Sequence, residues 1–126
     1  MKFTIPLALL FGLSAAAAFA ETWSGMLVDS KCYAAEERNV NPTDTETAVD
    51  TDKGYEIRYC TPRRKTKSFA VVKPDGRALP FDSAGDAKAS AYVQSAGKQR
   101  LYEVAVTGRR NGKRIQAESI SPVAGR

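Results

Sequence analysis

The sequence predicts one small, mostly β domain with a single short helix, and three observations support this fold class. Short segments rich in branched and aromatic residues recur along the chain, as expected for strands. Turn residues separate several of these segments, and residues 83–96 repeat their apolar side chains with helical spacing. The chain has 126 residues, enough for one domain after an export segment has been removed.

The first twenty residues have the pattern of a signal peptide. Lys2 provides the positive start, residues 3–13 form an apolar run, and the sequence AFA at residues 18–20 is a small-x-small cleavage site. The run is shorter than the roughly 20 residues of a membrane-spanning helix. We therefore expect cleavage near Ala20 and export of residues 21–126, to the periplasm or the medium, as one domain that does not span a membrane.

The exported part begins with a predicted strand and a long insertion. Residues 22–29 are rich in strand-forming side chains, and Gly25 among them indicates a bulge or a close backbone approach. Residues 30–67 show no sustained periodicity, so we expect a long loop there. Within it, residues 32–38 are compatible with a short helix and residues 55–59 with a strand.

Two further strands follow, joined by a turn. Residues 67–73 (KSFAVVK) form an apolar run typical of a buried strand. The sequence PDG at residues 74–76 is a turn into a partner strand at residues 77–81, where Pro80 indicates a sheet edge or the end of the strand.

A helix and a hairpin complete the chain. Ser83 is expected to begin the helix, with Asp86 in a capping-box position, and Gly97 to end it. Residues 101–109 and 113–121 are expected to pair across an Asn-Gly turn. The side chains expected to face the core are Ala89, Tyr92, Val93 and Ala96 of the helix and Tyr102, Val104 and Val106 of the first hairpin strand.

The order of these elements is β-β-β-α-β-β. Five strands with a helix between the third and the fourth are the order of the OB-fold, a small Greek-key barrel. A β-sandwich of this length would contain about seven strands. We therefore predict a five-stranded OB-fold-like barrel with a long loop between its first two strands.

The cysteines and the absence of histidine restrict the chemistry. Cys32 and Cys60 are the two cysteines of the chain, and in an oxidising compartment we expect them to form a disulfide at the base of the insertion. Without histidine or a Cys-x-x-Cys pair, we expect no catalytic, cofactor or metal site of the common kinds. Adjacent Glu36 and Glu37 would point apart and make a poor acid/base pair. The other acids, which lack calcium-loop spacing, are Asp44, Glu46, Asp50 and Asp52.

Charge is distributed unevenly along the chain. Residues 36–56 carry seven acids against two bases, whereas residues 57–126 carry fifteen bases against five acids. Two basic groups stand out, and we name them the loop group (Arg63, Arg64, Lys65 and Lys67) and the hairpin group (Arg109, Arg110, Lys113 and Arg114).

In an OB barrel the loops that carry these two groups usually frame the ligand face, so we expect them to meet at one anion-binding mouth. The alternative is a solvated basic face that is partly neutralised by residues 36–56. Tyr102 or Phe69 would be stacking platforms for nucleic acid. Export argues against nucleic acid as the physiological partner and favours lipopolysaccharide, acidic glycans or an acidic protein.

Several short motifs follow one another along the chain. The sequence WSGMLVDSKC at residues 23–32 combines aromatic-x-Gly, a branched run and Asp-Ser-x-Cys. Toward the end of the chain come Gly-Lys, Val-x-Val-Thr-Gly (residues 104–108), a second Gly-Lys and Ile-x-x-x-Ser-Ile (residues 115–120). In these motifs the chain resembles a family of small exported bacterial proteins of unknown function.

The resemblance implies an OB-like barrel and export, and no established activity. The chain departs from the family pattern at residues 60–63, where CTPR replaces Cys-Thr-x-x-Cys, so no metal or redox role is carried over. We expect a non-enzymatic binding or envelope accessory protein, with an envelope polyanion or an exported protein as its partner. The alternatives are an inhibitor or chaperone-like partner that uses residues 33–59 as its contact loop, and a carboxylate-based hydrolase.

Overall fold

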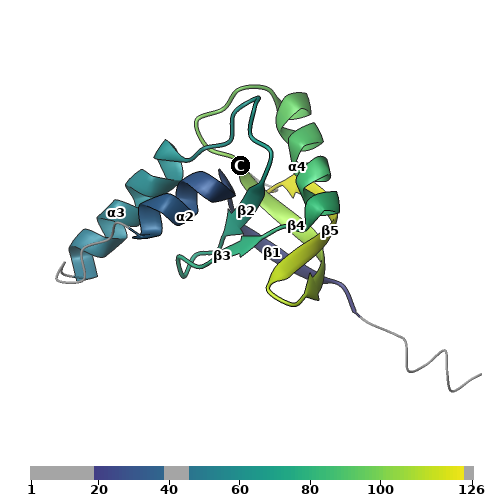
Figure 1. Cartoon of the computed structure of the whole chain (residues 1–126), viewed down its shortest axis with the longest axis horizontal. Helices are drawn as coiled ribbons and strands as arrows, with labels where there is room; N and C mark the ends of the chain where they lie inside the picture. The colour runs from purple at the N-terminus through teal and green to yellow at the C-terminus, as the bar shows by residue number, and fades with distance from the viewer. Residues whose placement is uncertain (1–18, 39–45, 124–126) are drawn as a thin grey trace, which may run out of the picture.

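The computed structural model describes residues 19–38 and 46–123, without the side chains of residues 46–52. The signal-peptide prediction therefore lies almost wholly outside the described residues. The described part folds into one five-stranded antiparallel sheet with three short helices (Figure 1). The elements are β1 (Glu21–Asp29), α2 (Ser30–Arg38), α3 (Glu46–Tyr59), β2 (Phe69–Val72), β3 (Ala78–Pro80), α4 (Ser83–Ala96), β4 (Glu103–Asn111) and β5 (Arg114–Pro122).

The strand order in the sheet is β3-β2-β1-β4-β5, with β1 at the centre. The sheet is not a closed barrel, because its two edges meet only just beyond β3. There Phe81 forms a single parallel bridge with Ile115, and the N–H of Asp82 donates to the Ile115 carbonyl at 3.0 Å. The β3 strand has three residues and ends at Pro80, which has no N–H to extend a ladder.

The central strand changes its partner near Gly25. Residues 21–26 of β1 pair with β4, and residues 26–29 pair with β2. A side chain at Gly25 would overlap the carbonyl oxygen of Val72 in β2. The close backbone approach predicted for this glycine is therefore confirmed.

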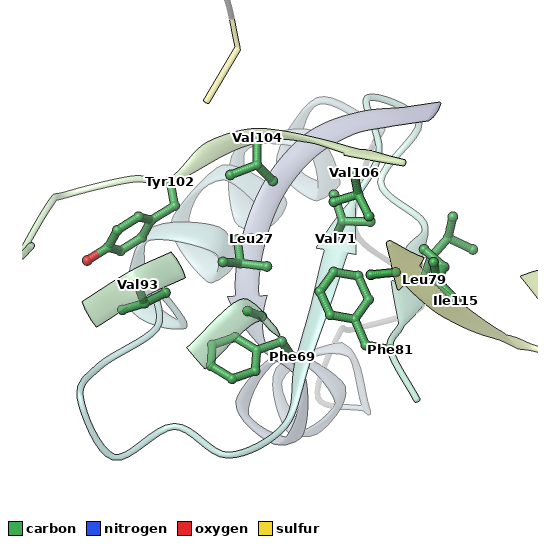
Figure 2. Close-up of a cluster of buried hydrophobic side chains, with 12 residues drawn as sticks. Leu27, Phe69, Val71, Leu79, Phe81, Val93, Tyr102, Val104, Val106 and Ile115 are labelled. Carbon is green, nitrogen blue, oxygen red and sulfur yellow. The ribbon is translucent and has the colours of Figure 1, made fainter. Parts of the chain in front are cut away.

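The main core lies between the sheet and α4 (Figure 2). Leu27, Phe69 and Val71 project from β1 and β2 into this core, and they meet Ala89 and Val93 of α4. The expected inward-facing residues are confirmed: Ala89, Val93, Tyr102, Val104 and Val106 are buried, and Tyr92 and Ala96 pack against them half-buried.

A second, smaller core lies on the opposite face of β1 and β2. Side chains alternate along a strand, so Val28, Ala70 and Val72 face away from α4 and pack against Tyr33 and Cys60. Both faces of β2 are covered, which is why this strand is a continuous apolar run without polar alternation.

The structure corrects two expectations about residues 30–67 and confirms a third. Three helices are present in the described part where one was expected, because α2 and α3 occupy much of residues 30–67. The helix expected at residues 32–38 is confirmed within α2. The strand expected at residues 55–59 is wrong: this segment is the end of α3. Glu56 and Cys60 are buried while Arg58 between them is exposed, which fits helical spacing and not the two-residue alternation of a strand.

The start of α4 also differs from expectation. Its N-cap is Asp82 rather than Ser83, and the Asp82 carboxylate accepts from the Gly85 N–H at 2.8 Å. Asp86 does not complete a capping box. Its carboxylate instead accepts from the N–H of Phe69 at 2.9 Å and so ties α4 to β2. Gly97 ends the helix at a positive φ of 79°, as expected.

Candidate anion-binding site

The two basic groups lie at opposite ends of the central strand. Asp29, the last residue of β1, pairs with Phe69, two residues beyond the loop group. Glu21, the first residue of β1, pairs with Gly108, next to the hairpin group. Eight residue steps along β1 span up to about 26 Å. The structure therefore places the two groups apart rather than around one mouth, because β4 runs antiparallel to β1 and carries its hairpin to the far end.

The hairpin group is exposed and partly engaged within the fold. Arg109 lies 3.4 Å from the carboxylate of Glu118 across the hairpin. Arg114 donates through a guanidinium nitrogen to the carbonyl of Phe81 at 2.9 Å, beside the point where the sheet edges meet. One cation of this group thus supports the fold and another is paired with an acid.

The loop group contributes to a pocket. A hollow of about 790 Å³ lies between the end of α3 with its following loop and the C-terminal end of α4. Four cations line it, namely Arg58, Arg63, Arg64 and Lys98, and none of its described lining residues is acidic. We call this hollow the basic pocket. Lys65 and Lys67 are exposed on the same loop but do not line it.

Hydrogen bonds around buried Thr66 hold the turn that carries Arg63 and Arg64. The Thr66 hydroxyl accepts from the Arg63 N–H at 2.9 Å and donates to the Asp29 carboxylate at 3.2 Å. The Thr66 N–H donates to the Arg63 carbonyl at 3.1 Å. Asp29 also caps α2, since its other carboxylate oxygen accepts from the N–H groups of Lys31 and Cys32. The basic turn is therefore anchored to the end of β1.

Two further contacts join the walls of the pocket. The Thr61 hydroxyl donates to the carbonyl of Arg100 at 2.8 Å and links the segment after α3 to the segment after α4. The Tyr102 hydroxyl donates to the carbonyl of Gly97 at 2.7 Å and satisfies the end of α4. Figure 1 shows these two segments side by side at one end of the sheet.

The expected disulfide forms one margin of this region. Cys32 in α2 is bonded to Cys60, directly after α3, with their Cα atoms 5.5 Å apart. No cysteine is free. The N–H of Asp29 donates to the Cys60 carbonyl at 2.8 Å, so the bond holds α2, α3 and β1 together where the pocket begins.

The balance of charge in the pocket is positive. The C-terminal ends of α3 and α4 each carry a partial negative charge of about half a unit. Four full positive charges exceed that total. Among the ion pairs within the described part of the chain, none involves Arg58, Arg63, Arg64 or Lys98.

The sequence did not point to the other two cations of the pocket or to its exposed aromatic ring. Arg58 and Tyr59 lay in a segment expected to be a strand, and Lys98 lay beside the glycine that ends a helix. Only the tertiary structure, which brings the segment after α3 beside the segment after α4, gathers them around one hollow with Arg63 and Arg64. The two suggested stacking platforms are wrong, because Phe69 is 1% and Tyr102 2% exposed and both belong to the core.

A second cluster of titratable groups lies between α2 and α3. Glu56 is 4% exposed, and one carboxylate oxygen of Glu56 and one of Glu37 are buried without a hydrogen-bond partner among the described residues. Lys53 lies 2.8 Å from the remaining oxygen of Glu37. Tyr33 is also buried here and donates to the Gly76 carbonyl at 3.2 Å.

The pKa values of the two glutamates shift in opposite directions. Burial, a hydrogen bond with Glu37 and the charge of Glu37 raise the pKa of Glu56 to about 7. Burial alone would raise the pKa of Glu37, but hydrogen bonds with Glu56 and Lys53 lower it overall. Burial and both carboxylates raise the pKa of Tyr33. Glycosidases hold their two catalytic carboxyl groups about 5–5.5 Å or about 6.5–9.5 Å apart. Glu37 and Glu56 are in hydrogen-bond contact and therefore closer together than either arrangement.

No metal or membrane site emerges from the described residues. They contain no group of three or more metal-ligating side chains. Of the acids considered for calcium, Asp44 and the side chains of Glu46, Asp50 and Asp52 lie outside the described residues. No helix in residues 19–38 or 46–123 is long and apolar enough to cross a membrane. Comparisons of the chain with protein-family models, curated proteins and solved structures found no significant match.

Proposed function

We propose that this chain is an exported, non-enzymatic binding protein that holds an anionic ligand in the basic pocket. The observation that carries the proposal is the gathering of four cations, without an acid, around one hollow. Its volume of about 790 Å³ falls within the roughly 300–1,000 Å³ of small-molecule sites. The turn that presents Arg63 and Arg64 is anchored through Thr66, so little ordering is needed when a ligand binds.

Export and an OB-like fold are parts of the same proposal. The N-terminal pattern supports export, and so does the disulfide, since such bonds persist in oxidising compartments. The strand order, the helix between β3 and β4, and the bridge from Phe81 to Ile115 support an OB-like barrel whose closure is limited to that bridge. N-terminal sequencing of the protein from the periplasm or medium should begin at Glu21, and an intact Met1 would contradict export.

Heparin chromatography tests the binding site. We expect the protein to be retained at low salt and released as salt rises, because screening weakens charge attraction. Replacing Arg63→Gln together with Arg64→Gln should abolish most of the retention. The matched control replaces the adjacent pair in the hairpin group, Arg109→Gln with Arg110→Gln, and should elute close to the wild type. Equal losses in both variants would indicate a general basic surface, and no retention at low salt would refute anion binding.

A second candidate function is contact with another exported protein through residues 33–59. One observation favours it: Tyr55 and Tyr59 of α3 are 56% and 54% exposed. Helices α2 and α3 also project from the sheet, as Figure 1 shows. A pull-down from the envelope fraction that depends on Tyr55 but not on Arg63 would favour this function over anion binding.

A further inference from the structure

An exposed aromatic ring lies at the wall of the basic pocket. Tyr59 lines the hollow beside Arg58, and its side chain is 54% exposed. Tyr55, one helical turn earlier, stacks against Tyr59 with 5.9 Å between ring centroids and 14° between ring planes. Tyr55 does not line the hollow, so Tyr59 is the ring of this stacked pair that a ligand in the hollow can contact.

The position of this ring is set before a ligand arrives. Tyr59 directly precedes Cys60, which is buried and bonded to Cys32. The N–H of Cys60 donates to the Glu56 carbonyl at 2.9 Å, so the last turn of α3 is intact at this point. A platform held by a disulfide and a stacked neighbour loses little conformational freedom on binding.

The other walls of the hollow carry neutral polar groups. Thr61, Gln94 and Gln99 line it together with the four cations. The glutamine amides can both donate to and accept from the hydroxyls of a ligand, and the Thr61 hydroxyl, which donates to the Arg100 carbonyl, can accept from them. The hollow thus combines a flat aromatic face, neutral hydrogen-bonding groups and guanidinium groups, which can bind carboxylate or sulfate in a bidentate manner.

We propose that the ligand of the basic pocket is an acidic saccharide, with a sugar ring stacked on Tyr59 and its anionic groups on Arg63 and Arg64. This inference rests on the proposed anion-binding function. The apolar C–H face of a sugar ring matches an exposed aromatic face, its hydroxyls match the glutamines, and its acid groups match the cations. An inorganic polyanion would use the cations alone and leave Tyr59 without a role.

A nucleotide is the competing ligand, since a base can stack on tyrosine while phosphates bind arginine. The disulfide favours the saccharide, because it indicates an oxidising compartment outside the cytoplasm, where acidic glycans are abundant. The experiment below separates the two.

Titration calorimetry with three probes tests the proposal: a sulfated heparin disaccharide, inorganic tripolyphosphate and ATP. Tyr59→Leu should weaken disaccharide binding about tenfold, as expected for loss of one stacked ring. The same variant should leave tripolyphosphate binding within about twofold. Tyr55→Leu is the matched control outside the hollow and should have the smaller effect on the disaccharide. Arg63→Gln with Arg64→Gln should weaken all three probes.

The outcomes distinguish failure of the saccharide inference from failure of the proposed anion-binding function. If Tyr59→Leu leaves the disaccharide unaffected while the arginine variant weakens it, anion binding stands and the saccharide inference is overturned. Tighter, Tyr59-dependent binding of ATP would overturn it in favour of a nucleotide. If the arginine variant changes nothing, the proposed function itself fails. Proton NMR gives a second readout, since sugar C–H resonances should shift upfield over the Tyr59 ring in the wild type and not in Tyr59→Leu.

Discussion

Replacing Glu56 by glutamine should stabilise the protein at alkaline pH. Glu56 is 4% exposed, and its pKa is raised from 4.5 to about 7. Between these two pH values the folded chain holds a proton that the unfolded chain has released. The stabilisation is complete below pH 4.5 and is lost as pH rises toward 7. A glutamine at this position stays neutral, and its amide can donate to Glu37 as the shared proton does.

The size of the effect follows from the shift. A difference of 2.5 pKa units corresponds to about 3–4 kcal/mol at most, because each unit contributes about 1.4 kcal/mol. Between pH 5 and pH 8 the wild type should lose about 2–3 kcal/mol of its free energy of unfolding through this group. Glu37 contributes with the opposite sign. Its pKa is lowered by folding, so its contribution to stability is present above about pH 4.5 and is lost as the pH falls below that value.

Urea unfolding at pH 5, 6, 7 and 8 measures this contribution. The Glu56→Gln variant should show a much flatter dependence on pH and exceed the wild type in stability at pH 8. Glu118→Gln, at an exposed position on β5, is the control and should retain the wild-type slope. Parallel slopes for the wild type and Glu56→Gln would refute the shared-proton interpretation of the pair.

Three further changes test the supports of the fold and the pocket. Replacing Cys32 and Cys60 together by serine should cost about 3–4 kcal/mol in urea unfolding, because the bond closes a loop with a sequence separation of 28; an unchanged midpoint would contradict this. Gly25→Ala should cost about 2–3 kcal/mol, since the methyl group overlaps a β2 carbonyl. A melting temperature equal to that of the wild type would contradict the close approach of this carbonyl to Gly25. Asp29→Ala removes the cap of α2 and the anchor of the basic turn, so it should cost about 2 kcal/mol and weaken heparin retention. Loss of stability with full retention would show that the turn does not depend on this anchor.

Spacing and turn residues in the sequence correctly predicted those strands and helices whose conformation depends on residues close to them in the chain. The hairpin of β4 and β5 follows from alternating side chains around Asn111 and Gly112, and α4 follows from its apolar stripe and Gly97. The segment at residues 55–59 was mispredicted because Tyr-x-Ile-x-Tyr satisfies both a strand period and part of a helical one. The exposure of Arg58 between buried Glu56 and Cys60 fits the helix and excludes the strand.

The candidate site depended more on tertiary structure than the fold did. Arg63 and Arg64 were recognisable as a charged cluster, but nothing local indicated that Arg58 and Lys98 would join them. The hairpin group had an equally strong signal in the sequence, and the antiparallel register of β1 with β4 carries it to the far end of the sheet.

By itself the sequence determined the strands, the helix α4 and the cysteine pair, because spacing and turn chemistry act over a few residues. It also determined the excess of positive charge after residue 56. Only the tertiary structure decided which charges share a pocket, which ring lines it and which glutamates are buried together. Those outcomes depend on contacts between residues 19 or more positions apart, such as Glu37 with Glu56 and Thr61 with Arg100, and packing alone selects them.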